Sequence, residues 1–206
     1  MSNTYYLVRH GQDQDNQNSI LNGHRDTPLT KIGIEQANTL ANEIKKLNLK
    51  IDLILSSPLQ RAYKTATILS EKLSLAPPLA EPLLIERDFG IMTGKKHSDI
   101  LPLCSPDILK TATVTYFLSP PDSESFPDLL KRAQKLLAKL DRDYQDSTLI
   151  LTTHGDFGKM IYAQYYQLDW QQVLKDFHFG NSEMLKLSPT TNPENSHQIK
   201  IEQYNI

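Results

Sequence analysis

The sequence predicts an α/β fold, a three-layer sandwich in which a mainly parallel central sheet carries helices on both faces. Short apolar runs rich in β-branched and aromatic residues alternate along the chain with longer stretches whose apolar residues recur every three or four positions. Strands and helices that alternate in this way form parallel strands joined by helical connections. The 206 residues are consistent with one domain, since a domain typically has ~150 residues.

Six short runs predict the strands of this sheet. The first four are mainly apolar, and several end at Gly, Pro or charged residues, as buried strands do. They lie at residues 4–8, 51–55, 83–85 and 148–152, followed by two late strands at about 183–187 and 198–204. The runs are separated by enough chain for helical crossovers.

Apolar residues at helical spacing predict four helices. Thr30 is expected to cap the first, whose apolar stripe runs from Ile34 to Leu47, and Ser57-Pro58 is expected to begin the second. The other two cover residues 129–140 and about 156–167. Residues 11–28 are expected to be a loop, and 95–127, broken by prolines, an insertion over the pocket with one short helix.

Composition excludes several classes of protein. Lys and Arg number 22 against 24 Asp and Glu, a formal net charge of −2, so there is no basic excess to hold nucleic acid. No apolar run approaches the ~18 residues of a membrane span. Cys104 is the single cysteine and fits a reducing compartment. The N-terminus runs directly into the first strand, so we expect a cytoplasmic protein without a signal peptide.

Charged residues follow the ends of several predicted strands. Arg9 and His10 follow the first strand, Arg61 follows the second, Glu86 follows the third, and His154 follows the run at 148–152. Because ligands of such sheets bind beyond the carboxyl ends of the strands, we expect these side chains to meet at one rim. Glycines beside them, among them Gly11 and Gly155, permit close approach of the backbone to a ligand.

This set of side chains suits phosphoryl transfer through a phosphohistidine. The planar fork of arginine matches phosphate oxygens. The positive charges of Arg9 and Arg61 would keep a neighbouring imidazole neutral and therefore nucleophilic. Glu86 could supply a proton to the leaving oxygen and later take one from water. Arginines beside His10 and His154 argue against a metal site, so neither a metal nor another cofactor is expected.

These residues lie in motifs that resemble those of the histidine phosphatase superfamily, in its phosphoglycerate-mutase-like branch. The motifs occur in the family's order and span most of the chain: Arg9-His10-Gly11-Gln12 resembles RHG(E/Q), Ser56–Ala62 with Thr65-Ala66 resembles SSPLxRAxxTA, Leu84–Gly90 with Gly94 resembles LxExxFGxxxG, His154-Gly155 resembles the second HG, and Asn181-Ser182 resembles the late asparagine. The resemblance implies a phosphoglycerate-mutase-like fold over residues 1–206.

The resemblance also implies a role for each site residue. His10 would be the phosphorylated nucleophile and Glu86 the acid and base. Arg9, Arg61 and His154 would hold the phosphoryl oxygens. Three further positions would contact substrate or phosphate: Asn16, the Asn22-Gly23 turn, and Gly155.

Three aspartates depart from the family's pattern. Asp156 follows the second HG, where a small or neutral residue is more usual, and Asp13 and Asp15 follow the first motif. They either face the pocket and repel a second anionic group of the substrate, or point to solvent. Of the histidines outside the motifs, which are His24, His97, His178 and His197, only His97 lies in the segment expected to cover the pocket.

Three functions are compatible with these residues. A mutase must hold a carboxylate and two phosphates, yet the segment between Gly94 and Glu124 contains only Lys95, Lys96 and Lys110 as basic residues. We therefore predict a phosphomonoesterase that hydrolyses a small phosphorylated metabolite. A phosphoglycerate mutase is the first alternative. A non-catalytic module that binds a phosphorylated ligand or a protein is the second.

Overall fold

A six-stranded sheet forms the centre of the molecule in the computed structural model, which describes residues 3–200. The strand order is β3-β2-β6-β1-β7-β8. The strands are β1 (Thr4–Arg9), β2 (Leu53–Ser56), β3 (Leu79–Ala80), β6 (Thr148–Thr153), β7 (Met184–Leu187) and β8 (His197–Ile199). The first four are parallel, and β7 and β8 are antiparallel to their neighbours. The mainly parallel α/β fold predicted from the sequence is confirmed.

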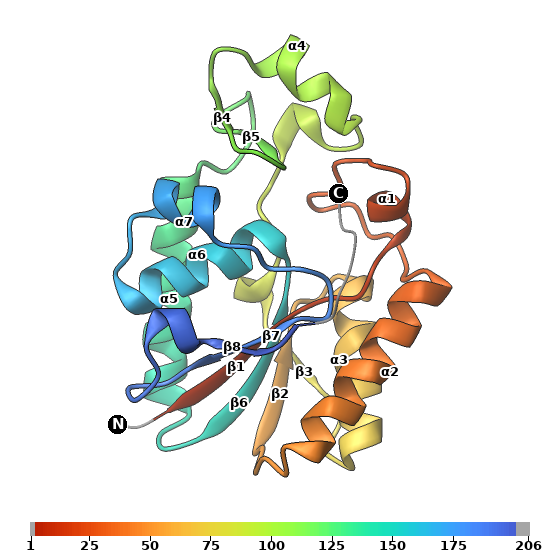
Figure 1. The fold of residues 1–206 in the computed structure, drawn as a ribbon, viewed down its shortest axis with the longest axis vertical. Coiled ribbons are helices and arrows are strands. Elements are labelled where there is room, and N and C mark those ends of the chain that lie inside the picture. Colours follow the sequence, from red (N-terminus) through yellow and green to blue (C-terminus); the bar gives the residue numbers. More distant parts are fainter. Residues whose placement is uncertain (1–2, 201–206) are drawn as a thin grey trace.

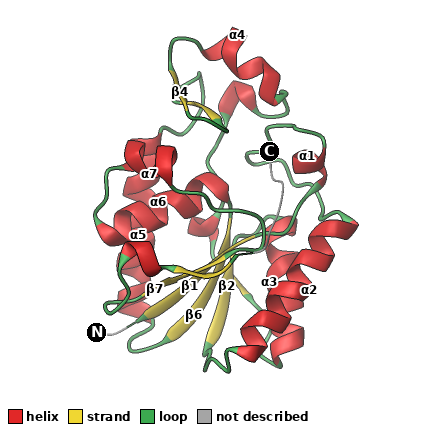
Figure 2. Ribbon diagram, in the orientation of Figure 1, coloured by secondary structure: helices red, strands yellow, loops and turns green. Residues whose placement is uncertain are grey.

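Helices cover both faces of the sheet (Figures 1 and 2). On one face lie α2 (Lys31–Lys46) and α3 (Gln60–Leu73), and on the other lie α5 (Phe126–Asp143), α6 (Gly155–Tyr166) and α7 (Trp170–Asp176). Alternate residues of β1 serve the two cores, because successive side chains of a strand point to opposite faces. Tyr5 and Leu7 pack in the core on the α5 and α6 side, whereas Tyr6 and Val8 pack in the core on the α2 and α3 side.

The register of the parallel strands determines where the site forms. Arg9 at the end of β1 lies opposite Thr153 at the end of β6, and Ser56 at the end of β2 lies opposite Thr152. His10, Ser57 and His154, each the next residue along its strand, therefore emerge at the same edge of the sheet. The edge with the carboxyl ends is the one expected to bind ligands.

Residues 95–125, most of the segment predicted as an insertion, form a separate layer beyond this edge, and Phe126 and Pro127 already belong to α5 (Figure 1). The layer contains α4 (Ile100–Cys104) and a two-stranded sheet of β4 (Ile108–Lys110) and β5 (Thr115–Phe117). It has an apolar cluster of its own, made of Leu21, Phe89, Met92, Ile100, Cys104 and Phe117. The layer thus rests on the loop after β1 as well as on the chain after Glu86.

Several predicted elements differ from the structure. The run 83–85 is no strand: Pro82–Leu84 is a 3-10 turn, and the edge strand is the shorter β3. The helix expected to start at Ser57 begins at Gln60, because Asp26 from a distant loop accepts the Gln60 N–H at 2.7 Å and replaces a local cap. Ile34 and Leu47 at the ends of the predicted stripe are exposed. Residues 201–204 of the last predicted strand lie outside the described residues.

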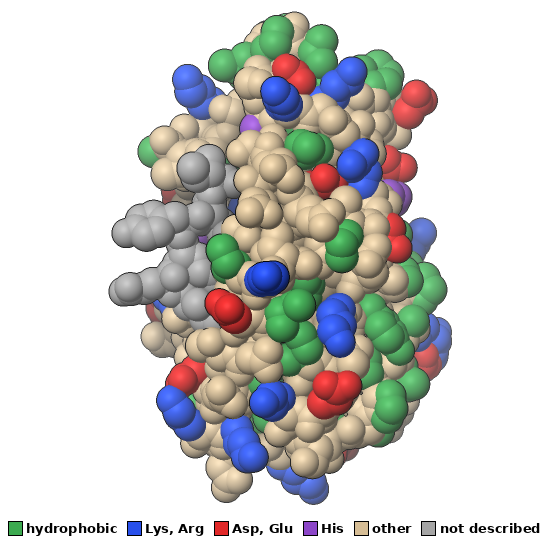
Figure 3. All heavy atoms as spheres, turned by 90° about the vertical axis from the view of Figure 1, so that its right-hand side faces the viewer, with side chains coloured by type: hydrophobic (Ala, Val, Ile, Leu, Met, Phe, Trp, Pro, Cys, Tyr) green, Lys and Arg blue, Asp and Glu red, His purple; other side chains and the backbone are tan. Residues whose placement is uncertain are grey.

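Short elements were missed by the sequence reasoning. Residues 11–28 contain a one-turn helix, α1 (Gln14–Gln17), capped by Asp13, and α7 follows α6. Three further 3-10 turns lie at Gly90–Met92, His97–Asp99 and Pro193–Asn195. Over residues 3–200, no helix is both long and apolar enough to span a bilayer. On the face formed by α2 and α3, positive and negative side chains are interspersed (Figure 3).

Candidate active site

His10 and His154 lie side by side at the sheet edge, with ring centroids 5.1 Å apart. Both are buried. Nδ1 of His10 lies 2.7 Å from the Gly11 carbonyl oxygen, which can only accept, so Nδ1 carries the proton. Nε2 of His10 lies 3.3 Å from Nε of Arg61, which can only donate. The unprotonated nitrogen of His10 is therefore the one aimed at the arginine.

The backbone around His10 is tightly held. A Cβ atom on Gly11 would lie 2.3 Å from the carbonyl oxygen of Gly33, so only glycine fits at position 11. The Gly11 N–H donates to Oγ1 of Thr65 at 3.1 Å, and Nδ2 of Asn181 donates to the His10 carbonyl at 2.8 Å. These contacts tie the loop after β1 to α3 and to the turn before β7.

Arg61 is fully buried in the first turn of α3 and anchored by loop carbonyls. Nη1 donates to the carbonyl of Arg25 at 2.6 Å, and Nη2 donates to that of Gly23 at 2.8 Å. Nε lies 3.2 Å from Oδ2 of Asp13, which is also fully buried. A buried ion pair needs further hydrogen bonds to both partners, and here they satisfy most of the two groups.

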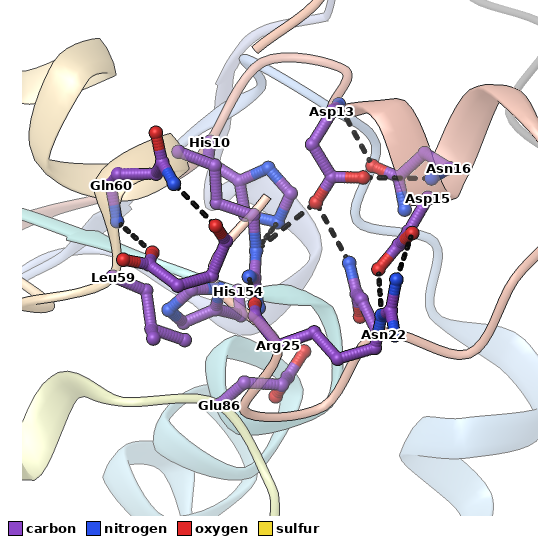
Figure 4. Close-up of polar contacts among 12 residues, drawn as sticks. His10, Asp13, Asp15, Asn16, Asn22, Arg25, Leu59, Gln60, Glu86 and His154 are labelled. Carbon is purple, nitrogen blue, oxygen red and sulfur yellow. Dashed lines mark hydrogen bonds and ion pairs between the residues drawn. The ribbon is translucent and has the colours of Figure 1, made fainter. Parts of the chain in front are cut away.

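The expectation for Asp13 and Asp15 was wrong on both counts, since neither lines the pocket or reaches solvent. Asp13 compensates the charge of Arg61, caps α1 through the Asn16 N–H at 2.7 Å, and accepts from Nδ2 of Asn22 at 2.8 Å. Asp15 is buried and pairs with Nε of Arg25 at 2.8 Å. Figure 4 shows this network beside His10. The aspartates shape the loop that carries the arginine's acceptors.

Glu86 is buried against the start of α6. Its Oε1 accepts from the backbone N–H groups of Arg87 at 2.8 Å and Phe157 at 3.0 Å, and Oε2 accepts from that of Asp156 at 3.3 Å. Burial raises the pKa of Glu86 above its ordinary value, and the nearby Asp156 carboxylate raises it further. A carboxyl group that keeps its proton to higher pH than a free glutamate is suited to proton donation.

The two histidines are held in the neutral form. Burial lowers the pKa of His10 and of His154 well below the ordinary value, and the positive charge of Arg61 acts in the same direction. Nε2 of His154 lies 2.8 Å from Oγ of Ser57, which also accepts from the Leu59 N–H at 3.3 Å. When the Ser57 hydroxyl donates to Nε2 of His154, the proton of His154 lies on Nδ1.

In that tautomer of His154, two buried nitrogen donors at this edge have no hydrogen-bond partner among the described residues. They are Nε of Arg9 and Nδ1 of His154. Nη1 of Arg9 donates to the Phe179 carbonyl at 2.8 Å, which fixes the guanidinium beside the pocket. Buried donors are normally satisfied, so a ligand oxygen is the natural partner for both groups. The geometry offers an anion site.

A pocket of about 130 Å³ opens next to this cluster, under the layer formed by residues 95–125. Five of the predicted site residues line it: Arg9, Asn16, Asn22, Glu86 and Gly155. Gly23 does not line it but supplies a carbonyl to Arg61. Figure 4 shows His10 and His154 near each other, with Glu86 below them in this view. Within residues 3–200, no group of three or more His, Cys, Asp or Glu side chains is arranged to hold a metal ion.

Sequence reasoning missed several residues of this region. Arg87 is buried, donates from Nε to Asp156 at 2.9 Å, and stacks on the rings of Phe117 and Phe126. Asp156, left open between pocket and solvent, lines the pocket and is ion-paired. Ser57, Tyr116 and Lys159 were not predicted as site residues. Only Arg87, adjacent to Glu86, could have been suspected from position in the chain.

Comparison with known proteins identifies the class. A model of the histidine phosphatase superfamily (branch 1) matches residues 5–201. A 2,3-bisphosphoglycerate-dependent phosphoglycerate mutase of Bartonella bacilliformis is 34% identical over 162 residues, which are 76% of this chain and 78% of that protein. A Hydrogenobacter thermophilus protein named “Putative phosphoserine phosphatase 2” is 35% identical over 161 residues, 76% of this chain and 75% of that one.

A solved structure shows the same architecture over the full length. The native structure of a mycobacterial glucosyl-3-phosphoglycerate phosphatase superposes with a TM-score of 0.77 at 26% identity, covering 97% of this chain and 98% of that one. Together with the family model, this similarity means that the chain belongs to the histidine phosphatase superfamily, branch 1. Its members named here include both phosphatases and mutases.

Proposed function

We propose that the protein is a phosphomonoesterase that hydrolyses a small phosphorylated metabolite through a phosphohistidine on His10. The observation that carries the proposal is the pairing of the unprotonated Nε2 of His10 with Nε of Arg61 at 3.3 Å, in a cluster with a carboxyl group of raised pKa. The imidazole is a neutral nucleophile, and the arginine marks where the phosphoryl oxygens lie.

The reaction has two steps. In the first, Nε2 of His10 attacks phosphorus, the ester P–O bond breaks, and the departing oxygen takes a proton from Glu86. In the second, water attacks the phosphohistidine, the P–N bond breaks, and Glu86 takes a proton from the water. Inorganic phosphate leaves and both residues return to their starting state.

Charge on the transferring phosphoryl group is balanced by donors already in place. Arg61 commits Nε, one N–H of Nη1 and one of Nη2 to the protein, so two of the five guanidinium N–H groups are left for oxygens. Nε of Arg9 and Nδ1 of His154 are the other available donors. Donors fixed before the reaction need no reorganisation during it, which is why losing one typically costs ~10²–10³ in rate.

Hydrolysis is favoured over mutase activity by the charges that line the pocket. A bisphosphorylated intermediate brings a second phosphate, which requires several cations. Arg87 is neutralised by Asp156, and Lys95, Lys96 and Lys110 do not line the pocket. Among the lysines of residues 3–200, only Lys159 lines the pocket. The mutase remains the second candidate because relatives that carry that name are about as similar as the phosphatases.

The test is phosphate release by the purified protein from p-nitrophenyl phosphate and from alkyl phosphates, with a chelator present. We expect turnover, an acid-labile phosphoprotein after rapid quenching, and loss of both in His10→Ala. His197→Ala, on β8 outside the pocket lining, is the matched control and should keep both signals. A parallel assay uses 3-phosphoglycerate together with 2,3-bisphosphoglycerate. If isomerisation of 3-phosphoglycerate is faster than phosphate release, the protein is a mutase and the proposed hydrolase function is wrong.

A further inference from the structure

Lys159 is a buried lysine that lines the pocket without belonging to the phosphoryl site. It lies on α6, and only 8% of the surface of the residue is exposed to solvent. Its Nζ donates to Oη of Tyr116 on β5 at 2.5 Å, which is the one hydrogen bond that the ammonium group makes with residues 3–200. An ammonium group has three N–H donors. Buried lysines are rare unless paired, so a cation with spare donors at a pocket wall points to a ligand.

Tyr116 adds a second available donor at the same place. Because its Oη accepts from Lys159, its own hydroxyl hydrogen must point elsewhere, and no described residue accepts it. Burial raises the pKa of Tyr116, so the phenol stays protonated. The ring of Tyr116 also packs edge-on against Phe126, which fixes its orientation. One cation and one neutral O–H therefore adjoin each other at the pocket.

The charge of Lys159 is not cancelled by an ion pair with a described residue. Asp156 lines the same pocket but is held by Arg87 at 2.9 Å, and the carboxylate oxygens of Glu86 are taken up by backbone N–H groups. Burial lowers the pKa of Lys159 to about 8, with Asp156 and Glu86 opposing that shift and Arg9 adding to it. At neutral pH the group is mostly an ammonium ion.

We propose that Lys159 and Tyr116 form a subsite that binds a carboxylate on the leaving group of the substrate. The inference rests on the proposed function and names the chemical class of its substrate, a phosphorylated hydroxy acid. A carboxylate oxygen has two lone pairs and can accept from the ammonium and the phenol together. A second phosphate dianion is disfavoured here, because one lysine cannot balance two charges in a pocket whose walls include Val114, Phe117 and Phe179.

The experiment compares phosphorylated hydroxyalkanoic acids of increasing chain length with alkyl phosphates of the same length. We define the carboxylate advantage as the ratio of kcat/KM for the acid to kcat/KM for the matched alkyl phosphate. Wild type is expected to show this advantage at the chain length that reaches from the phosphoryl cluster at His10 to the subsite of Lys159 and Tyr116. Lys159→Met should reduce that ratio about tenfold to a hundredfold and Tyr116→Phe by less, since Lys159 supplies a positive charge as well as a hydrogen bond whereas Tyr116 supplies a neutral donor. Lys64→Met, exposed on α3, should leave it unchanged.

A pH series separates recognition from a structural role. Titratable or charged groups around Lys159 are Asp156, Glu86, Arg9 and Tyr116, and His97 and His178 line the same pocket. The carboxylate advantage of wild type should fall as pH rises above about 8, where Lys159 loses its proton. It should not fall in Lys159→Arg, whose charge does not titrate there. A ratio that is independent of pH in wild type contradicts the inference.

Failure of this inference differs from failure of the proposed function. If wild type hydrolyses both series equally at every length, the subsite is wrong and the phosphatase stands. If neither series releases phosphate, the proposed function fails, and binding to His10→Ala tests the subsite directly. That variant should bind the acid more tightly than the alkyl phosphate, and equal binding overturns the subsite.

Discussion

The phosphoryl cluster and the pocket beside it are built in opposite ways. In the cluster, His10 and Arg61 are buried and fastened to backbone carbonyls, and Asp13 balances the charge. In the pocket, Lys159 and Tyr116 keep donors available. The cluster stands on the ends of parallel strands, whereas the pocket wall comes partly from an added layer. The chemical step is thus fixed by the sheet, and selectivity depends on a part of the molecule that can vary separately.

The largest expected effect breaks the chemistry and leaves the pocket intact. Glu86→Gln removes the proton donor and should lower kcat/KM, which reports the first step and not the later hydrolysis of the phosphohistidine, for alkyl phosphates about 10²–10⁴-fold, the usual contribution of general acid–base catalysis. The loss should be much smaller for p-nitrophenyl phosphate, because p-nitrophenolate departs without a proton. Steady-state rates on both substrates measure the difference. Equal losses on both would contradict the role of Glu86 as the acid.

The second prediction concerns stability in the cluster. Asp13→Ala leaves the buried charge of Arg61 without its carboxylate, and removing one partner of a buried ion pair typically costs about 3–5 kcal/mol. Urea unfolding should show this loss. Asp13→Asn, which keeps the shape and the acceptor for the Asn16 N–H, is the matched variant and should lose less. If Asp13→Ala unfolds at the same urea concentration as wild type, Asp13 does not compensate Arg61.

The third prediction is a pH dependence of stability that comes from the cluster. The pKa values of His10 and His154 lie well below 6.5 in the folded protein, so below pH 6.5 the unfolded chain binds more protons. Stability therefore falls as pH drops below 6.5, by about 1.4 kcal/mol per pH unit for each histidine. In His154→Gln, the unfolding free energy should fall less steeply with decreasing pH below 6.5, because the contribution of one histidine is lost. An unchanged slope would show that His154 titrates normally.

The smallest effect is expected in the pocket. His97 is exposed and lines the pocket from the 3-10 turn His97–Asp99. His97→Ala should alter kcat/KM for substrates with longer leaving groups by less than about tenfold, since a small change of pocket contact is worth ~1 kcal/mol. The melting temperature should stay the same. A loss of alkyl phosphate turnover as large as that of Glu86→Gln would mean that the two regions are not separable.

The sequence allowed the sheet and the gathering of the site residues to be predicted for one physical reason. Apolar runs such as 4–8 and 148–152 ended at charged residues, and parallel strands bring such ends together. The start of α3 at Gln60 could not be predicted, because its cap, Asp26, comes from a loop 34 residues away along the chain. Local patterns carry no information about such a partner.

Buried charged residues also could not be predicted from local sequence. Asp13 reads as a surface residue from its polar neighbours, yet it is fully buried because it meets Arg61 across the fold. Lys159 reads as the polar position of a helix, yet it is buried under a strand from the added layer. Burial of a charge is decided by which distant segment packs over it, and the chain had to be seen folded before either residue could be assigned.

The attachment of Arg61 to the carbonyls of Gly23 and Arg25 has a consequence for how such an enzyme can diversify. Those acceptors are backbone atoms, which every amino acid supplies, whereas deleting a single residue between Asn22 and Asp26 would displace both at once. The hairpin of β4 and β5 supports no such contact to Arg61. Lengthening or shortening that hairpin is therefore a route to new substrates that leaves the reaction itself untouched.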